Sequence, residues 1–241
     1  MHAFPVLPAF MHSTASCWPF SVQLPNCTLA TANFHTTADP AAVIGSGLQP
    51  VGSNPKRQAE YLAGRRCAAL ALVTAGHDYY VPERDSHSGR PLWPDGWCGS
   101  ITHSHGIAAA VTGQTCHWHS LGLDIEKMIA PDRAQRLRRA ILTPGEQQRM
   151  EQLEPAVAAR NLTLIFSAKE SLFKALNPLT DIYFGFQDAQ VLPTTQAGQI
   201  TLQLLRDLAP PYIAGTMFSA LWCEYGHGML TLVSLPAKQH H

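Results

Sequence analysis

The chain has 241 residues, of which 46% are hydrophobic and 14% charged, so it can bury a substantial core and lacks the composition of a disordered protein. Its seventeen basic and seventeen acidic side chains cancel, which excludes the overall positive field typical of nucleic-acid-binding proteins and leaves any anion site to local clusters. The six cysteines form no CxxC pair, so neither a disulfide framework nor cysteine chemistry is indicated.

The first residues include Pro5, Pro8 and Pro19 and lack the basic start of a secretory signal. No run approaches the ~20 apolar residues that a membrane-spanning helix needs. We therefore expect a cytoplasmic protein with no membrane span and no nucleic-acid partner.

The spacing of apolar residues is irregular in the first segment and becomes helical after residue 55. Residues 1–55 carry only short apolar runs such as Val22–Leu24, which indicates strands and loops. From Lys56 to Val73 apolar residues recur at helical spacing, so a helix is predicted there. At ~100° per residue, Arg57 and Arg65 lie roughly 80° apart on this helix, close enough to face one anionic ligand. A solvated basic face is the alternative.

A loop containing Gly89-Arg90-Pro91 follows, and Arg90 is a third candidate for an anion site. Residues 100–103 and 107–112 then predict two short strands joined as a hairpin. Two His-x-His runs, at 103–105 and 117–119, suggest zinc, but they lack the paired spacing of strong zinc motifs.

Alternation at 121–126 predicts a strand that sends its aliphatic residues to the core and both Asp124 and Glu126 to the opposite face. Two carboxylates on one face suit a hard divalent cation. An Asp-x-Glu pair is also common on solvated strand edges, so a third carboxylate is needed to favour a metal site.

Thr143 to Glu146 form a capping box that predicts a helix start, and a longer helix is predicted over 155–176. On this helix Glu170 and Lys174 are one turn apart, an arrangement also common in exposed ion pairs. Alternating segments then predict strands at 200–204, 217–223 and 229–235. The order of elements indicates an α+β fold with helices packed on antiparallel strands.

Several motifs together resemble the 4'-phosphopantetheinyl transferases in order and spacing. The match spans residues 56–176 and is most similar to the long, pseudo-dimeric branch that activates enterobactin and surfactin synthetases. The motifs are Lys56-Arg57, Leu62-Ala63-Gly64-Arg65, Gly89-Arg90-Pro91, Gly99-Ser100-Ile101-Thr102-His103, Gly122-Leu123-Asp124-Ile125-Glu126 and Phe166-Ser167-Ala168-Lys169-Glu170-Ser171 through Lys174.

This resemblance implies two similar α+β lobes, residues 1–119 and 120–241, with coenzyme A in the cleft between them. It implies Mg2+, with Mn2+ as a substitute, held by Asp124, Glu126 and Glu170. The catalytic residues would be Glu170, Lys174 and His103. The coenzyme A contacts would be made by Arg57, Arg65, Arg90, Thr102, His103 and Lys174.

The implied reaction is transfer of 4'-phosphopantetheine from coenzyme A to a serine of an apo acyl or peptidyl carrier protein, releasing 3',5'-ADP, as in a holo-[acyl-carrier-protein] synthase. Glu170 would take the serine proton, and siderophore or fatty acid synthesis would be served. The basic segment 127–149 would dock an acidic carrier by charge, and a chain that contains both lobes would act as a monomer.

Two other functions use the same residues. A magnesium-dependent hydrolase of coenzyme A or another nucleotide diphosphate would need the same metal and arginines, with water as the nucleophile. A non-catalytic carrier-binding protein could keep the fold, although the presence of all the catalytic candidates argues for activity. The identity of the carrier does not follow from the sequence.

Overall fold

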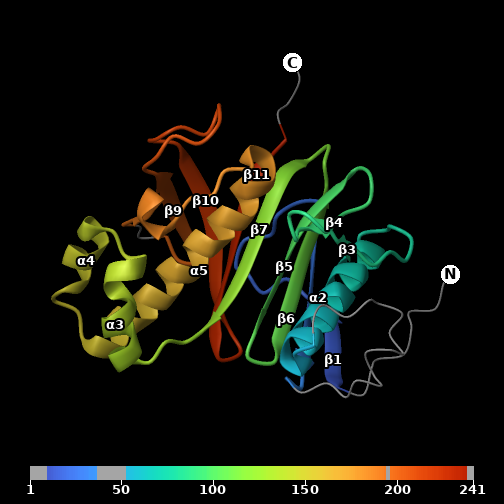
Figure 1. Ribbon diagram of the computed structural model, residues 1–241, viewed down its shortest axis with the longest axis horizontal. Coiled ribbons are helices and arrows are strands. Elements are labelled where there is room, and N and C mark those ends of the chain that lie inside the picture. The colour runs from blue at the N-terminus through green and yellow to red at the C-terminus, as the bar shows by residue number, and fades with distance from the viewer. Residues whose placement is uncertain (1–9, 37–52, 194–195, 238–241) are drawn as a thin grey trace. The chain divides into compact units, whose positions relative to one another are not determined.

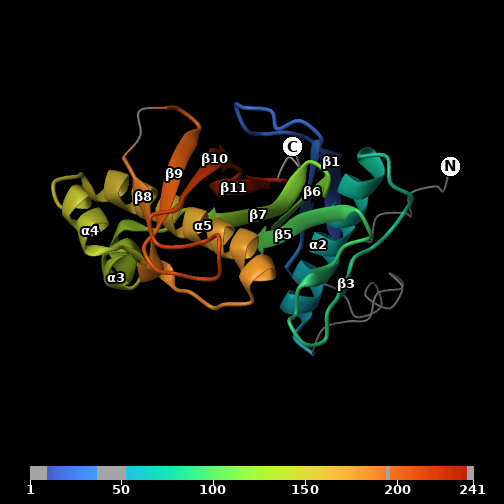
Figure 2. The same cartoon turned by 90° about the horizontal axis from the view of Figure 1, so that it is seen from above.

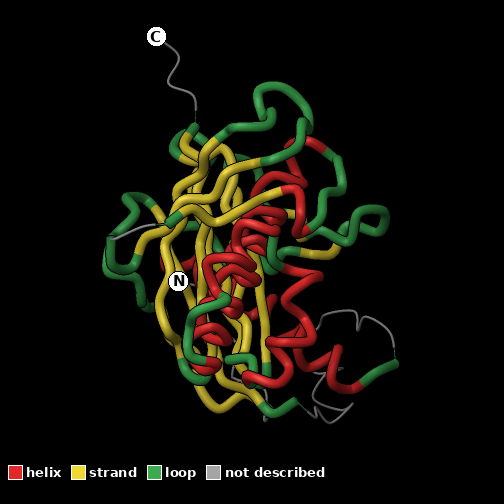
Figure 3. The backbone as a smooth tube through the Cα atoms, turned by 90° about the vertical axis from the view of Figure 1, so that its left-hand side faces the viewer, coloured by secondary structure: helices red, strands yellow, loops and turns green. Residues whose placement is uncertain are grey.

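The computed structural model describes residues 10–36, 53–193 and 196–237, and it divides the chain into two compact units. The first unit is built mainly from residues 23–121 and the second mainly from residues 122–236. In Figure 3 the strands, in yellow, form layers against which the helices, in red, pack. The α+β fold class predicted from the sequence is confirmed.

The first unit has a sheet with the strand order β1-β2-β6-β5, covered by the helix α2 (Figure 1). A small two-stranded sheet, β3-β4, lies in the connection between α2 and β5. The elements are β1 (Met11–Ser16), β2 (Cys27–Phe34), α2 (Pro55–Thr74), β3 (Glu83–Arg84), β4 (Pro91–Leu92), β5 (Trp97–Ser104) and β6 (Ile107–Gln114).

The second unit has a sheet with the order β7-β11-β10-β9-β8, and the long helix α5 packs along it (Figure 2). The helix α3 packs on α5. The elements are β7 (Trp118–Lys127), α3 (Pro131–Ile141), α4 (Pro144–Met150), α5 (Pro155–Thr180), the 3-10 turn η1 (Phe186–Asp188), β8 (Ala189–Leu192), β9 (Gln199–Leu204), β10 (Met217–Tyr225) and β11 (Gly228–Pro236).

Both units place their main strands in the same order. In each, the strand before the long helix (β2 or β7) lies beside the last strand (β6 or β11), which in turn pairs with the strand before it (β5 or β10). The helices α2 and α5 both begin at a proline, where the missing N–H would have no helical partner. Two separate hydrophobic cores result, one under each helix.

The predicted helices and hairpin agree with the structure, with small differences at the ends. The capping box of α4 is present, because Thr143 Oγ1 accepts from the Glu146 N–H and Glu146 Oε2 accepts from the Thr143 N–H. The helix α5 continues to Thr180, four residues beyond the predicted end. The run Val22–Leu24 is not a strand, and β2 begins instead at Cys27. Part of the predicted first segment, residues 1–9 and 37–52, lies outside the described residues.

No helix among the residues that the structure describes is long and apolar enough to cross a bilayer.

Candidate active site

The candidate residues form two groups, one in each unit. In the second unit, Asp124 and Glu126 extend from the same face of β7, as the alternation predicts. This face is not a solvated edge, since Asp124 is only 4% exposed and the helix α5 lies against it.

The close packing of α5 on β7 depends on Gly122. A Cβ atom at this position would overlap the backbone oxygen of Ser171 and lie 2.6 Å from the backbone nitrogen of Ala175. Only glycine therefore permits this approach. It brings Lys174, on the adjoining turn of α5, to Asp124, which is two residues further along the same strand face.

Lys174 connects the helix to the strand. Its Nζ donates to Asp124 Oδ1 at 2.7 Å and to the carbonyl oxygen of Leu123 at 3.1 Å. The ammonium group is the positive charge beside the carboxylates in this structure. Glu170, one turn earlier on α5, is half-buried, and so is Glu126.

Burial and nearby charges shift the pKa values of both glutamates. The pKa of Glu126 is raised to about 7, mainly by burial and then by the negative charges of Asp124 and Glu170, while Lys174 and Arg133 act in the opposite direction. Burial followed by Asp124 also raises the pKa of Glu170, and Lys174 lowers it. Phenylalanines lie one turn to either side of Glu170, with Phe166 against the ring of Phe186 and Phe173 against Tyr183. Carboxyl groups in such surroundings hold protons more tightly than in water.

Two serines of the same motif hold α5 in place. Ser167 Oγ donates to the carbonyl oxygen of Asp124 and also lies 2.9 Å from Thr231 Oγ1. Ser171 Oγ is 2.7 Å from the same threonine oxygen and donates to the Thr231 carbonyl oxygen. Both serines are fully buried. The sequence marks them only by their spacing of four residues, which places them on one helix face.

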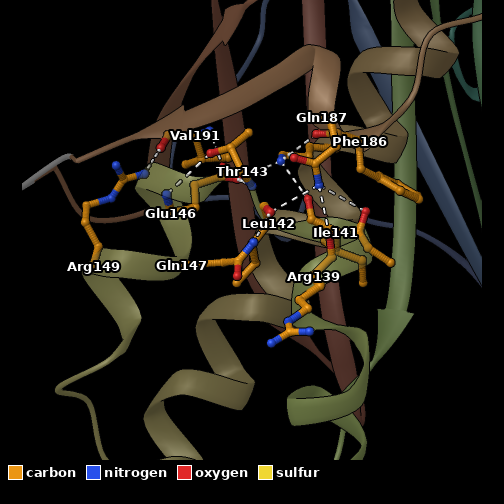
Figure 4. Close-up of polar contacts among 12 residues, drawn as sticks. Arg139, Ile141, Leu142, Thr143, Glu146, Gln147, Arg149, Phe186, Gln187 and Val191 are labelled. Carbon is orange, nitrogen blue, oxygen red and sulfur yellow. Dashed lines mark hydrogen bonds and ion pairs between the residues drawn. The ribbon is translucent and has the colours of Figure 1, made fainter.

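Lys169 supports α5 from another side, through buried polar contacts; Figure 4 labels its partners Ile141, Glu146 and Phe186. Its Nζ donates to Glu146 Oε2 at 2.7 Å and to the carbonyl oxygens of Ile141 and Phe186, both at 2.8 Å. Glu146 Oε1 accepts from the N–H of Val191. The side chain beside Glu170 in sequence therefore ties α5 to the end of α3, to α4 and to the start of β8.

The residues present fit a divalent cation by their chemistry. Carboxylate oxygens suit Mg2+, which is usually bound by one or two carboxylates together with substrate phosphates rather than by a cage of protein ligands. In the described ranges, however, no three His, Cys, Asp or Glu side chains form a group that could hold a metal ion.

The second group of candidates lines a cavity of about 370 Å³ in the first unit. Arg57, Arg65 and His103 all contribute to it, together with Arg84, which the sequence reasoning missed. The size falls within the range of small-molecule sites. The lining residues are Arg57, Glu60, Tyr61, Arg65, Arg84, Gly89, Pro91, Ile101 and His103.

Arg65 is the most informative of these residues. It is 5% exposed, its guanidinium lies 4.7 Å from the centre of the Tyr61 ring, and burial lowers its pKa. Within the described chain its Nε has no hydrogen-bond partner. A buried charged donor with an unmet hydrogen bond is costly unless a ligand meets it.

Two predicted contacts lie elsewhere. Arg90 is not among the cavity residues, although its neighbours Gly89 and Pro91 are. Gly89 has φ +74°, and Arg84 lies so close to it that a Cβ would be 2.9 Å from Arg84 Nη2. Thr102 is buried, and the strand alternation places it on the face opposite His103.

The architecture and the two groups of polar residues define a two-unit α+β protein with a basic cavity and a carboxylate cluster. The sequence matches two family models, "4'-phosphopantetheinyl transferase N-terminal domain" over residues 51–113 and "4'-phosphopantetheinyl transferase superfamily" over residues 120–223.

Three known proteins are similar to the chain, and two of them are named 4'-phosphopantetheinyl transferases. The chain is 36% identical over 187 residues to enterobactin synthase component D of Salmonella typhimurium, covering 77% of this chain and 75% of that protein. It is 34% identical over 185 residues to 4'-phosphopantetheinyl transferase Svp of Streptomyces mobaraensis, covering 73% and 71%. It is 36% identical over 137 residues to 4'-phosphopantetheinyl transferase PptT of Mycobacterium tuberculosis, covering 56% and 58%. The chain belongs to the 4'-phosphopantetheinyl transferase superfamily.

Proposed function

We propose that this chain transfers the 4'-phosphopantetheine group of coenzyme A to a serine of an apo acyl or peptidyl carrier protein and releases 3',5'-ADP. The similarity to enterobactin synthase component D favours a carrier in siderophore synthesis, and a holo-[acyl-carrier-protein] synthase activity toward fatty acid synthesis is a second possible use. The observation that carries the proposal is the pairing of Asp124 with Lys174 beside Glu126 and Glu170, two half-buried glutamates whose pKa values burial and the charge of Asp124 raise.

The basic cavity supports the coenzyme A part of the proposal. Arg57, Arg65 and Arg84 can form charge-assisted hydrogen bonds with phosphate oxygens, and His103 adds a further donor. A phosphate there would meet the Nε of Arg65. We assign this cavity to a phosphate of coenzyme A, with the 3'-phosphate as the preferred group.

The carboxylates support the transfer step. Asp124, Glu126 and Glu170 are the residues that would hold Mg2+, or Mn2+ in its place, and the ion would supply positive charge to the pyrophosphate when bound. Lys174 can move from Asp124 to a phosphate oxygen, since it is 29% exposed and its stem is long.

In the reaction, the serine oxygen forms a bond to the β-phosphorus of coenzyme A while the bond from that phosphorus to the oxygen of 3',5'-ADP breaks. The serine proton passes to Glu170, directly or through a water. Burial raises the pKa of Glu170, which makes it a better proton acceptor than an exposed glutamate. Lys174 offsets the negative charge that develops on the leaving group.

The helix α3 is suited to carrier docking. Arg133, Arg136 and Arg139 are exposed on it, and the charge of Arg133 reaches Glu126, so the basic helix begins beside the carboxylates. An acidic carrier helix would meet these side chains by complementary charge. Charge reversal at Arg136 and Arg139 should raise the KM for the carrier, whereas reversal at the exposed Arg206 should not; equal KM values would exclude this docking surface.

The transfer itself is tested by the intact mass of an apo carrier protein after incubation with the enzyme, coenzyme A and Mg2+. A carrier that gains one phosphopantetheine group, and does so neither with Glu170→Ala nor without metal, supports the proposal. Consumption of coenzyme A without any gain in carrier mass, for acyl, peptidyl and aryl carriers alike, would show hydrolysis instead. If neither changes, a carrier-binding role without catalysis remains.

A further inference from the structure

The basic cavity of the first unit contains one residue of the wrong sign for an anion site. Among the described residues that line it, Glu60 is the acidic one, beside three arginines and a histidine. A carboxylate that faces a bound phosphate would weaken binding by repulsion. Its presence therefore needs a reason other than direct contact with the phosphate.

The contacts of Glu60 suggest that reason. Its Oε2 lies 3.8 Å from His103 Nδ1, and its Oε1 lies 3.8 Å from Lys56 Nζ. The Glu60 side chain is 13% exposed, whereas the His103 side chain is 42% exposed. One carboxylate oxygen thus faces an imidazole, and the other faces the ammonium group of the exposed Lys56.

The position of Glu60 follows from the same close packing that shapes the cavity. A Cβ on Gly64 would lie 2.7 Å from Ile101 Cγ2, so glycine lets α2 approach β5 closely. Glu60 is one helical turn before Gly64, and His103 is two residues after Ile101 on the same strand face. The approach of helix and strand therefore sets the carboxylate against the imidazole.

The charges around His103 come from two elements besides its own. Lys56, Arg57 and Arg65 on α2 and Arg84 on β3 are cations, and each disfavours a protonated imidazole. Glu60 is an acidic group that favours it, with Oε2 at 3.8 Å from the ring. Only the protonated ring carries a positive charge for a phosphate and donates from both nitrogens.

We propose that Glu60 is a positioning residue that turns the Nδ1 edge of His103 toward α2 and holds the ring in its protonated form, so that its other edge receives a phosphate of coenzyme A. This inference rests on the proposed coenzyme A function of the cavity. It assigns to Glu60 no contact with the ligand.

Three other roles make different predictions. If Glu60 only repels anions, its removal tightens binding at every pH. If it accepts a hydrogen bond from the ligand, its removal weakens binding at every pH, with or without His103. If it only supports packing, its removal weakens binding at every pH and lowers stability.

The test is calorimetric binding of coenzyme A and of 3',5'-ADP, without metal, at about pH 6 and about pH 8, across the range in which histidine changes charge. The proteins are the unchanged chain, Glu60→Gln, His103→Asn and the double variant. Lys56→Met is the matched control, because it removes the other partner of Glu60 and leaves His103 in place.

We expect Glu60→Gln to bind about fivefold more weakly at about pH 8 and equally well or more tightly at about pH 6, where the ring is protonated without help. In the His103→Asn background Glu60→Gln should lose this dependence on pH, and Lys56→Met should not show it. A Glu60→Gln effect of the same sign at both pH values overturns the inference and leaves the cavity assignment intact. If the unchanged chain binds neither ligand, the cavity assignment fails and the inference with it.

Discussion

The helices α2 and α5 have the same burial at every position from 55 to 72 and from 155 to 172, counted from the proline at which each begins. Leu62 and Leu162, like Leu72 and Leu172, fill matching positions of the two cores. The two helices nevertheless carry different polar and charged side chains at matching positions. Where α5 has Lys169, Glu170 and Lys174, α2 has Ala69, Leu70 and Thr74.

The two helices also use their buried charges differently. Lys169 on α5 donates to Glu146 and to two carbonyl oxygens, so its charge stabilises the folded structure. Arg65 on α2 lines a cavity and keeps an unmet donor, so its charge is available to a ligand. One pattern of apolar residues can thus build two similar scaffolds, while a few polar positions decide what each scaffold does.

The largest effect should come from the buried ion pair. Lys169→Met leaves Glu146 charged and buried, and it should lower the free energy of unfolding by about 3–5 kcal/mol. Arg65→Met breaks no ion pair with a carboxylate among the described residues and should leave stability unchanged or higher. Urea unfolding compares the two, with the exposed Lys56→Met as a control within about 0.5 kcal/mol of the unchanged chain. Equal losses for Lys169→Met and Arg65→Met would contradict the contrast.

Alanine substitutions at the two glycines Gly122 and Gly64 should also have unequal effects, with the larger loss at Gly122, which packs against α5. Gly122→Ala places a Cβ against the backbone of α5, which cannot yield without moving Lys174 from Asp124. We expect transfer activity to fall on the order of a hundredfold, the effect of a misplacement of about 1 Å.

Gly64→Ala meets only the Ile101 side chain, which can turn, and should cost about 1–3 kcal/mol of stability with a smaller loss of activity. Gly145→Ala is the control, since the nearest atom to its Cβ, Arg149 Nη1, is 3.7 Å away. Carrier modification rates of the three variants decide the order, and a Gly64→Ala defect as large as that of Gly122→Ala would show that the packing argument is wrong.

A smaller effect concerns pH. Because the pKa of Glu126 is raised from 4.5 to about 7, the folded chain holds this proton more tightly than the unfolded chain. The metal-free protein should therefore lose stability as pH rises between these values and stay less stable above them. Glu126→Gln should remove this loss, which amounts to roughly 1–2 kcal/mol once the partial exposure of the group is considered.

Urea unfolding of both proteins across this pH range measures the Glu126 contribution. The two stabilities should agree at low pH, diverge as the pH rises from about 4.5 to about 7, and stay apart above, with the variant more stable. A difference that stays constant with pH would mean that burial does not perturb this carboxyl group.

The smallest effect should distinguish two arginines of the first unit. Arg84 lines the basic cavity and Arg90 does not. Arg84→Met should raise the KM for coenzyme A about three- to tenfold, as expected for loss of one charge-assisted contact. Arg90→Met should change it less than twofold. Steady-state kinetics with a saturating carrier gives both values, and the reverse order would return Arg90 to the site.

Much of the fold could be predicted because its signals are local. The capping box at Thr143, the alternation around Asp124 and the helical spacing before Lys174 each lie within a few residues of sequence. The pairing of Lys169 with Glu146 could not be predicted in this way, because it joins side chains 23 residues apart that only the tertiary fold brings together.

In the candidate site, too, local features could be predicted from the sequence and features that depend on tertiary packing could not. Asp124 and Glu126 share a face because of strand geometry, but their approach to Lys174 depends on the packing at Gly122. Arg84 was missed because a loop decides which arginine reaches the cavity, and loop conformation at Gly89 is not encoded by any periodic pattern.

The central claim is that α2 recognises coenzyme A and α5 carries out the transfer. Calorimetric titration of coenzyme A, without metal, into Arg65→Met and Glu170→Gln tests it most directly. We expect Arg65→Met to lose about tenfold or more in affinity and Glu170→Gln to bind within about twofold of the unchanged chain while failing to modify a carrier. Normal binding by Arg65→Met together with lost binding by Glu170→Gln would contradict this division of roles.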